Sequence, residues 1–95
     1  LMGGNDKMAI GAMRCLKERK LRVPEDISVV GVDDAPAAAF TNPGLTTVRH
    51  DLFLIGSMAV DSALALFKGE AQLIEKTLPI QLVVRESTGP AAARG

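Results

Sequence analysis

The sequence contains few aromatic residues. They make up 3% of the 95 residues, and neither tryptophan nor tyrosine occurs. Apolar residues still reach 47% of the chain, so a hydrophobic core has to be aliphatic. Cores of Val, Ile, Leu and Ala are typical of layered α/β domains. A chain of this length forms at most one small domain or a piece of a larger one.

An excess of charge of one sign is also absent. Eleven lysines and arginines balance eleven aspartates and glutamates, so the formal net charge is zero. A protein that binds nucleic acid by itself usually carries a basic excess that neutralises phosphates. The chain has no basic cluster with interleaved aromatic residues either. We therefore expect that it does not bind DNA on its own.

Cysteine and long apolar runs are scarce. The single cysteine, Cys15, excludes an internal disulfide and a multi-cysteine metal site, and we expect it to be a small buried residue. No apolar run approaches the roughly 18 residues of a membrane span, and residues 1–4 do not resemble a signal peptide. With one histidine, the chain offers no catalytic Ser/His/Asp or Cys/His arrangement. We expect a cytoplasmic protein that is not an enzyme, with no cofactor, bound metal or membrane contact.

Apolar periodicity predicts two helices. The first begins after Asn5, a good N-cap, and runs to about residue 19. The second covers about residues 51–68 and is followed by Gly69, the residue type that favours the position after a helix end. Shorter strands are predicted at residues 45–49 and within 73–84. The expected apolar faces are Met8, Ala9, Ala12, Met13 and Leu16 in the first helix, and Leu52, Ile55, Ala59, Ala63 and Leu66 in the second.

Residues 27–32 are the most informative stretch. Four of the six are β-branched, which is typical of a buried strand. The strand stops at Asp33 and Asp34, and Pro36 cannot continue a central strand. Open α/β sheets bind ligands outside the carboxyl ends of their strands. We therefore predict that Asp33 contacts a polar small molecule and that Asp34 caps or hydrogen-bonds the following loop.

Four stretches form a recognisable series. They are NDKMAIGA at residues 5–12, LRVPEDISVVGVDD at 21–34, PGLTTV at 43–48 and LVVREST at 82–88. In their order and spacing they resemble the LacI/GalR family of bacterial transcription regulators. The resemblance covers nearly the whole chain.

The resemblance implies a fold and a role. Such regulators join a DNA-binding headpiece to a two-lobed sensor that resembles periplasmic sugar-binding proteins. Residues 1–88 would be a fragment of the C-terminal lobe, an α/β fold with a partial three-layer parallel sheet and flanking helices, and residues 89–95 a disordered tail. The chain would sense a small effector, a sugar or a nucleoside-like molecule, as part of a homodimer. Operator DNA would be bound only through the headpiece, which this chain lacks.

The family's effector contacts map onto Asn5 and Asp33. For Asn5 the alternative is helix capping, which leaves the amide NH₂ available. For Asp33 the alternative is a loop-opening turn. His50 follows the predicted strand at 45–49, at a place where the family commonly has a polar residue near the effector. The alternative role for His50 is that of a surface or capping residue. Because an imidazole changes its charge near neutral pH, His50 would make effector binding pH-dependent.

The family's dimer contacts map onto five residues, which are Ile10, Met13, Arg14, Phe40 and Thr41. Met13 fits an ordinary core position equally well.

The sequence departs from the family at Lys20, because the family usually has glycine at that helix end. If the left-handed turn persists there, a non-glycine residue costs about 1 kcal/mol.

Two other roles stay open. A solute-binding protein for transport shares the fold, and a signal peptide without an upstream helix-turn-helix would favour it. The second is a purely structural or oligomerisation module, in which Asp33 is only a turn residue.

Overall fold

The computed structural model describes residues 1–70 and 77–91 of the chain. The chain divides into two compact units. The first consists of residues 1–49 and 81–95, and the second of residues 50–80, which are inserted between two strands of the first. The sequence led us to expect one lobe over residues 1–88, so this division was not foreseen.

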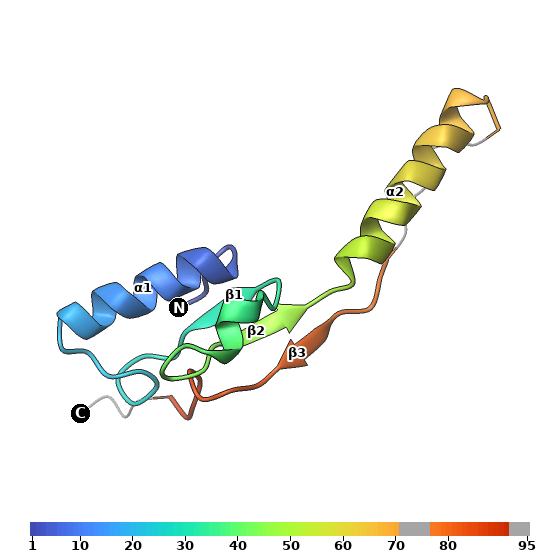
Figure 1. Ribbon diagram of the computed structural model, residues 1–95. Helices are drawn as coiled ribbons and strands as arrows, with labels where there is room; N and C mark the ends of the chain where they lie inside the picture. The colour runs from blue at the N-terminus through green and yellow to red at the C-terminus, as the bar shows by residue number, and fades with distance from the viewer. Residues whose placement is uncertain (71–76, 92–95) are drawn as a thin grey trace. The chain divides into compact units, whose positions relative to one another are not determined.

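A small mixed sheet forms the centre of the first unit (Figure 1). Strand β1 (Val30–Val32) pairs in parallel with β2 (Thr46–Arg49), and β2 pairs antiparallel with β3 (Gln81–Val83). Residues 1–3 extend the sheet beyond β1, since Gly3 N donates to Val30 O at 2.8 Å and Met2 bridges Val30 in parallel. The α/β architecture with parallel central pairing is as predicted.

The antiparallel strand departs from the expected parallel sheet. Arg49, the last residue of β2, pairs with Gln81, the first residue of β3. The inserted residues 50–80 therefore leave and return at the same end of β2, and a chain that returns there has to run the other way. The predicted strand run within 73–84 falls partly on residues outside the described ranges.

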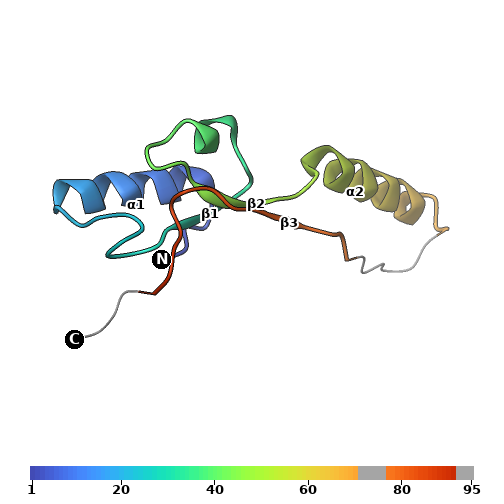
Figure 2. The ribbon, with the colours of Figure 1, turned by 90° about the horizontal axis from the view of Figure 1, so that it is seen from below.

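Helix α1 (Asp6–Glu18) packs along β1, and Figures 1 and 2 both show the two side by side. The segment at residues 1–3 also comes close to α1, which depends on Gly3, because a Cβ there would lie 2.7 Å from Ala9 N. The short 3₁₀ helix η1 (Pro36–Ala39) completes the core from the loop after β1. The buried core residues are Ala9, Met13, Val29, Ala38 and Leu45, and Ile10, Leu16 and Val23 pack against them.

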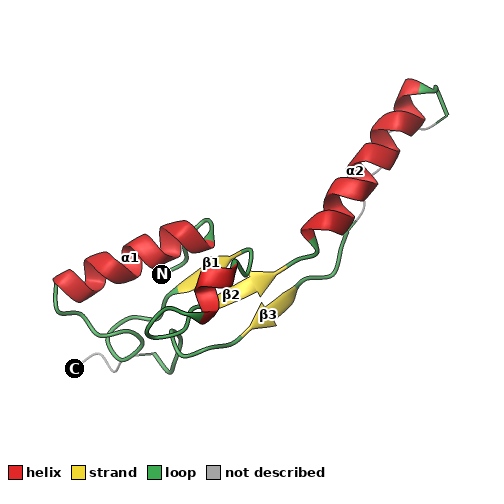
Figure 3. Cartoon of the chain, viewed as in Figure 1, coloured by secondary structure: helices red, strands yellow, loops and turns green. Residues whose placement is uncertain are grey.

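Two predictions about the first unit need correction. The predicted strand at 27–32 is shorter, because only residues 30–32 pair as a strand, although Val29 is fully buried. Cys15 is exposed rather than buried, because the side of α1 that faces the core carries Ala9 and Met13. Long loops surround these elements (Figure 3).

The predicted tail at residues 89–95 is described in part. Its first residue, Gly89, donates a 3.1 Å hydrogen bond to Ser28, and residues 92–95 lie outside the described residues.

The second unit is dominated by α2 (Leu52–Phe67). Asp51 caps it by accepting a hydrogen bond from Leu54 N at 2.9 Å, and Gly69 adopts φ 70° at its end, as predicted. Among the residues that the structure describes, none of α2 is buried, and only Ile55 of the predicted apolar face is half-buried. Neither described helix has the length and apolar character needed to span a membrane.

Candidate effector-binding site

Asp33 lies in a constrained turn at the carboxyl end of β1. Its backbone has φ 114° and that of Asp34 has φ 53°, both in the region that non-glycine residues rarely occupy. Such conformations cost about 1–3 kcal/mol each and persist only where the surroundings fix them. The N–H of Asp33 donates to Val48 O at 2.8 Å, which anchors the turn to β2. The turn therefore presents the Asp33 side chain at the edge where the strands end.

Asn5 lies at the same edge of the sheet. Its side-chain oxygen accepts a hydrogen bond of 2.9 Å from Met8 N, so the capping role is confirmed. Two bonds made by its neighbours place Asn5 beside the turn. Gly3 is hydrogen-bonded to Val30 in β1, and the Asp6 carboxylate accepts from Ala35 N at 2.6 Å. The structure thus brings the two predicted effector contacts, Asn5 and Asp33, to one sheet edge.

His50, the third predicted contact, immediately follows β2 and is half-buried. It is the first residue of the second unit. Its role as an effector contact stays a prediction.

Asp34 is an ion-pair centre, so the prediction that its side chain bonds the following loop is wrong. Its carboxylate accepts from Arg85 Nη2 at 2.8 Å and from Arg49 Nε at 2.7 Å. The hydrogen bond from Arg85, followed by that from Arg49, lowers the pKa of Asp34 below the ordinary aspartate value. Asp34 therefore serves to fix the turn, and Arg85 adds a bond to Leu45 O at 2.9 Å.

Asp6, the first residue of α1, is a residue that the sequence analysis did not single out. It is 1% exposed and lies inside the unit. Its Oδ1 accepts from Thr47 Oγ1 at 2.6 Å. The signal that points to such a partner is the hydroxyl of Thr47 on a buried strand, because buried polar groups are almost always hydrogen-bonded.

Comparison with known proteins identifies the family. Residues 1–88 match the model of the periplasmic binding protein-like domain. The lactose operon repressor of Escherichia coli (strain K12) is 44% identical over 88 residues, which are 93% of this chain and 24% of that protein. The chain belongs to the LacI/GalR family. It spans about a quarter of the length of this curated relative.

Solved structures of family members show the same fold. A lac repressor dimer bound to operator and the anti-inducer ONPF matches with a TM-score of 0.80 and 45% identity, covering 92% of this chain and 30% of that one. A complex of the transcriptional regulator CelR with cellobiose matches with a TM-score of 0.81 and 33% identity, covering 90% and 27% of the two chains. The first unit therefore has the periplasmic-binding-protein-like fold of LacI/GalR regulators.

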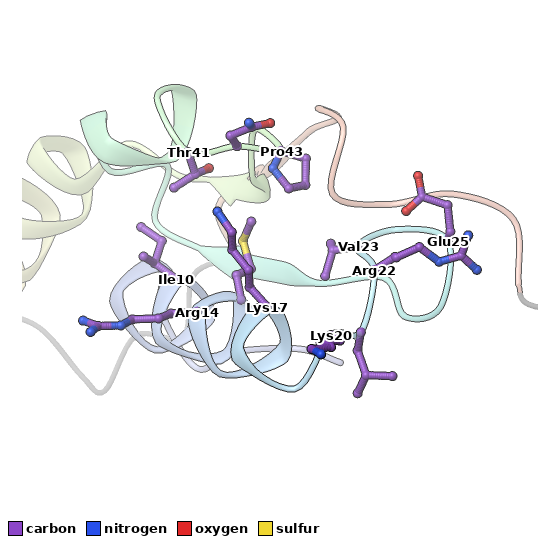
Figure 4. Close-up of a pocket in the computed structure, with 12 residues that line it drawn as sticks. Ile10, Arg14, Lys17, Lys20, Arg22, Val23, Glu25, Thr41 and Pro43 are labelled. Carbon is purple, nitrogen blue, oxygen red and sulfur yellow. The ribbon is translucent and has the colours of Figure 1, made fainter.

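A surface hollow collects most of the predicted dimer contacts. It has a volume of about 790 Å³ and lies between α1 and the loop at residues 41–43 (Figure 4). Ile10, Met13, Arg14 and Thr41 line it. Met13 also belongs to the core, so both of its predicted roles are compatible with its position. Phe40 does not line the hollow but is 87% exposed in the same loop.

Proposed function

We propose that the first unit is part of the C-terminal lobe of an effector-binding domain in a longer LacI-type transcription regulator, and that it senses a sugar. The observation that carries this proposal is the placement of Asn5 and Asp33 at one sheet edge. Sugar hydroxyls are both donors and acceptors. A carboxylate accepts from two hydroxyls at once, and the NH₂ of a capping Asn donates to a third.

The regulatory role follows from a two-state sensor. An effector shifts the equilibrium between two lobe arrangements only if it binds one of them more tightly, and the dimer passes that preference to operator affinity. Operator binding itself belongs to a headpiece outside these residues, because the chain has no net positive charge. We propose a cytoplasmic homodimer without catalytic activity.

Relatives favour the regulator over a transport protein. A lac repressor dimer binds operator, and CelR binds cellobiose, which are the two activities that the proposal combines. A periplasmic solute-binding protein would share the sugar site but not the operator response. Measurement of operator affinity with and without sugar separates these functions.

A thermal-shift screen of sugars and nucleosides against the full-length regulator tests the proposal directly. A ligand that binds only the native state raises the melting temperature, and a ligand at a hundredfold its Kd stabilises by about 2.7 kcal/mol. The expected result is a shift with one sugar class. A screen in which no sugar or nucleoside shifts the melting temperature contradicts the proposed effector.

Substitution of Asp33 identifies the site. Asp33→Asn should weaken binding of the shifting sugar at least tenfold, because a neutral amide accepts hydrogen bonds less strongly than a carboxylate. The matched control is Asp26→Asn, which changes the same charge at the opposite end of the β1 segment, where Asp26 pairs with Arg22. Equal affinity of the Asp33→Asn variant and the wild type would support the purely structural role.

His50 is tested by the pH dependence of sugar affinity between about pH 5.5 and 8, the range in which an ordinary imidazole changes charge. A change in affinity that His50→Gln removes supports the contact. A flat profile contradicts the predicted pH dependence of binding.

A further inference from the structure

We propose that Asp6 and Thr47 are positioning residues for the effector site. Buried and out of reach of the ligand, they hold the turn at residues 33–35 in the backbone conformation that places the Asp33 carboxylate. This inference rests on the proposed function, since it concerns the same site. It adds two residues that do not contact the effector but set its affinity.

The hydrogen bonds of the turn carry the inference. Three successive backbone N–H groups are fixed by hydrogen bonds: Asp33 N donates to Val48 O at 2.8 Å, Asp34 N to Thr47 Oγ1 at 3.2 Å, and Ala35 N to Asp6 Oδ2 at 2.6 Å. The φ angles of 114° and 53° at Asp33 and Asp34 are unfavourable for residues with a Cβ. Without these bonds the turn would relax toward negative φ and move the Asp33 side chain.

Thr47 links the carboxylate of Asp6 to the turn. Its hydroxyl has one proton and two lone pairs. The proton goes to Asp6 Oδ1 at 2.6 Å, and a lone pair accepts from Asp34 N at 3.2 Å. Both residues are shielded from water, with 0% of Thr47 and 1% of Asp6 exposed. A bond in such a low-dielectric environment is strong, so the hydroxyl restrains the turn.

Asp6 connects both proposed effector contacts. Its two carboxylate oxygens bond Thr47 and Ala35, and its backbone directly follows Asn5 at the start of α1. The carboxylate therefore fixes the distance between the helix start that carries Asn5 and the turn that carries Asp33. Gly31 makes room for it, because a Cβ at Gly31 would collide with Asp6 Oδ1.

The test measures sugar affinity by calorimetry in the full-length regulator, with lactose, ribose and cellobiose as probes. Thr47→Val removes the hydroxyl while keeping the branched shape, and we expect at least a tenfold loss of affinity. Thr47→Ser retains the hydroxyl and should recover the affinity. If Thr47→Val does not fold, Asp6→Asn replaces it, with the same expected loss.

The matched control is Thr46→Val in the same strand. Thr46 is 2% exposed, and its hydroxyl bonds Arg85 N and Thr88, each at 2.9 Å, but not the turn. A general loss of stability would lower sugar affinity equally in both valine variants. A positioning role predicts that only Thr47→Val weakens binding.

A double-mutant cycle separates this inference from the proposed function. Once Asp33→Asn has removed the carboxylate, adding Thr47→Val should cost no further affinity, because the positioned group is gone. If Asp33→Asn weakens binding but Thr47→Val has no effect, or an effect of the same size with and without Asp33→Asn, the positioning inference is wrong and the proposed function stands. If no probe binds the wild type, or Asp33→Asn leaves its affinity unchanged, the proposed function fails, and the inference fails with it.

Discussion

Arg85 Nη2 donates a hydrogen bond of 2.8 Å to Asp34 Oδ1, across 51 positions of sequence. The same guanidinium bonds Leu45 O at 2.9 Å, so one side chain joins the turn after β1 to the segment that enters β2. Arg49 adds a second ion pair to Asp34 at 2.6 Å. Because the side chain of Asp34 is only 10% exposed, solvent screens the Arg85 pair weakly. The turn that carries Asp33 is therefore held by charge as well as by the hydrogen bonds of its N–H groups.

The Asp34 ion pairs predict acid sensitivity. Arg85, then Arg49, lower the pKa of Asp34 in the folded state. The native protein thus binds fewer protons here than the unfolded chain, whose aspartates titrate near about 3.9, and stability from this site rises with pH. It is fully present above about pH 5 and is lost as the pH falls through the lowered native pKa. Asp34→Asn should cost about 2 kcal/mol at neutral pH and remove this acid-dependent part in denaturant titrations between pH 2.5 and 7.

The control for acid sensitivity is Asp26→Asn. Asp26 also has a lowered pKa, caused first by its side-chain hydrogen bond with Arg22, but that pair is more exposed than the Asp34 pairs, with 32% of the Asp26 side chain and 69% of the Arg22 side chain accessible. Surface pairs of this kind contribute little, so Asp26→Asn should leave the acid profile close to that of the wild type. If both variants lose stability equally, the Asp34 ion pairs contribute no more to stability than the Asp26 surface pair.

The turn after α1 predicts a stabilising substitution. Lys20 adopts φ 61° at the position that follows the Arg19 C-cap, where helices favour glycine. Lys20→Gly should raise the free energy of unfolding by about 1 kcal/mol, because it removes the left-handed penalty of a residue with a Cβ. Lys20→Ala keeps that penalty and should give no gain. A chemical-denaturation comparison in which alanine stabilises as much as glycine would assign the effect to the lysine side chain.

Local signals were the ones that sequence reasoning could use. The cap at Asn5 and the glycine after α2 depend on residues within one helical turn, so they were predicted correctly. The antiparallel course of β3 and the contact between Asp6 and Thr47 depend on pairings between distant residues, 41 positions apart for the latter. No local pattern encodes such pairings. The family resemblance implied the proposed effector contacts at Asn5 and Asp33, and the strand end also pointed to Asp33, but neither signal indicated which residues support them.

Removal of the Ser87 hydroxyl should destabilise the fold strongly. It is fully buried, donates from Oγ to Val29 O at 2.6 Å and accepts from Thr46 N at 2.8 Å. Ser87→Ala leaves a buried carbonyl and a buried N–H without their partner, so it should lower the free energy of unfolding by about 2 kcal/mol or more. Ser28→Ala is the matched control, because the Ser28 hydroxyl bonds Gly89 in an exposed position where water can replace it. Equal costs in urea titration would show that the Ser87 bonds contribute nothing beyond those at the surface.

The exposed side chain of Phe40 is a predicted dimer contact. It is 87% exposed in the loop whose next residue, Thr41, lines the hollow against α1, and nothing within the described chain accounts for a large apolar ring there. Phe40→Asp should convert the proposed full-length dimer to a monomer in sedimentation, because a carboxylate in an apolar interface cannot be desolvated without a partner. Its folding should be unaffected, since the side chain is outside the core. Ala37→Asp adds the same charge at an exposed position of η1 and should leave the dimer intact. A Phe40→Asp protein that still sediments as a dimer would remove Phe40 from the interface.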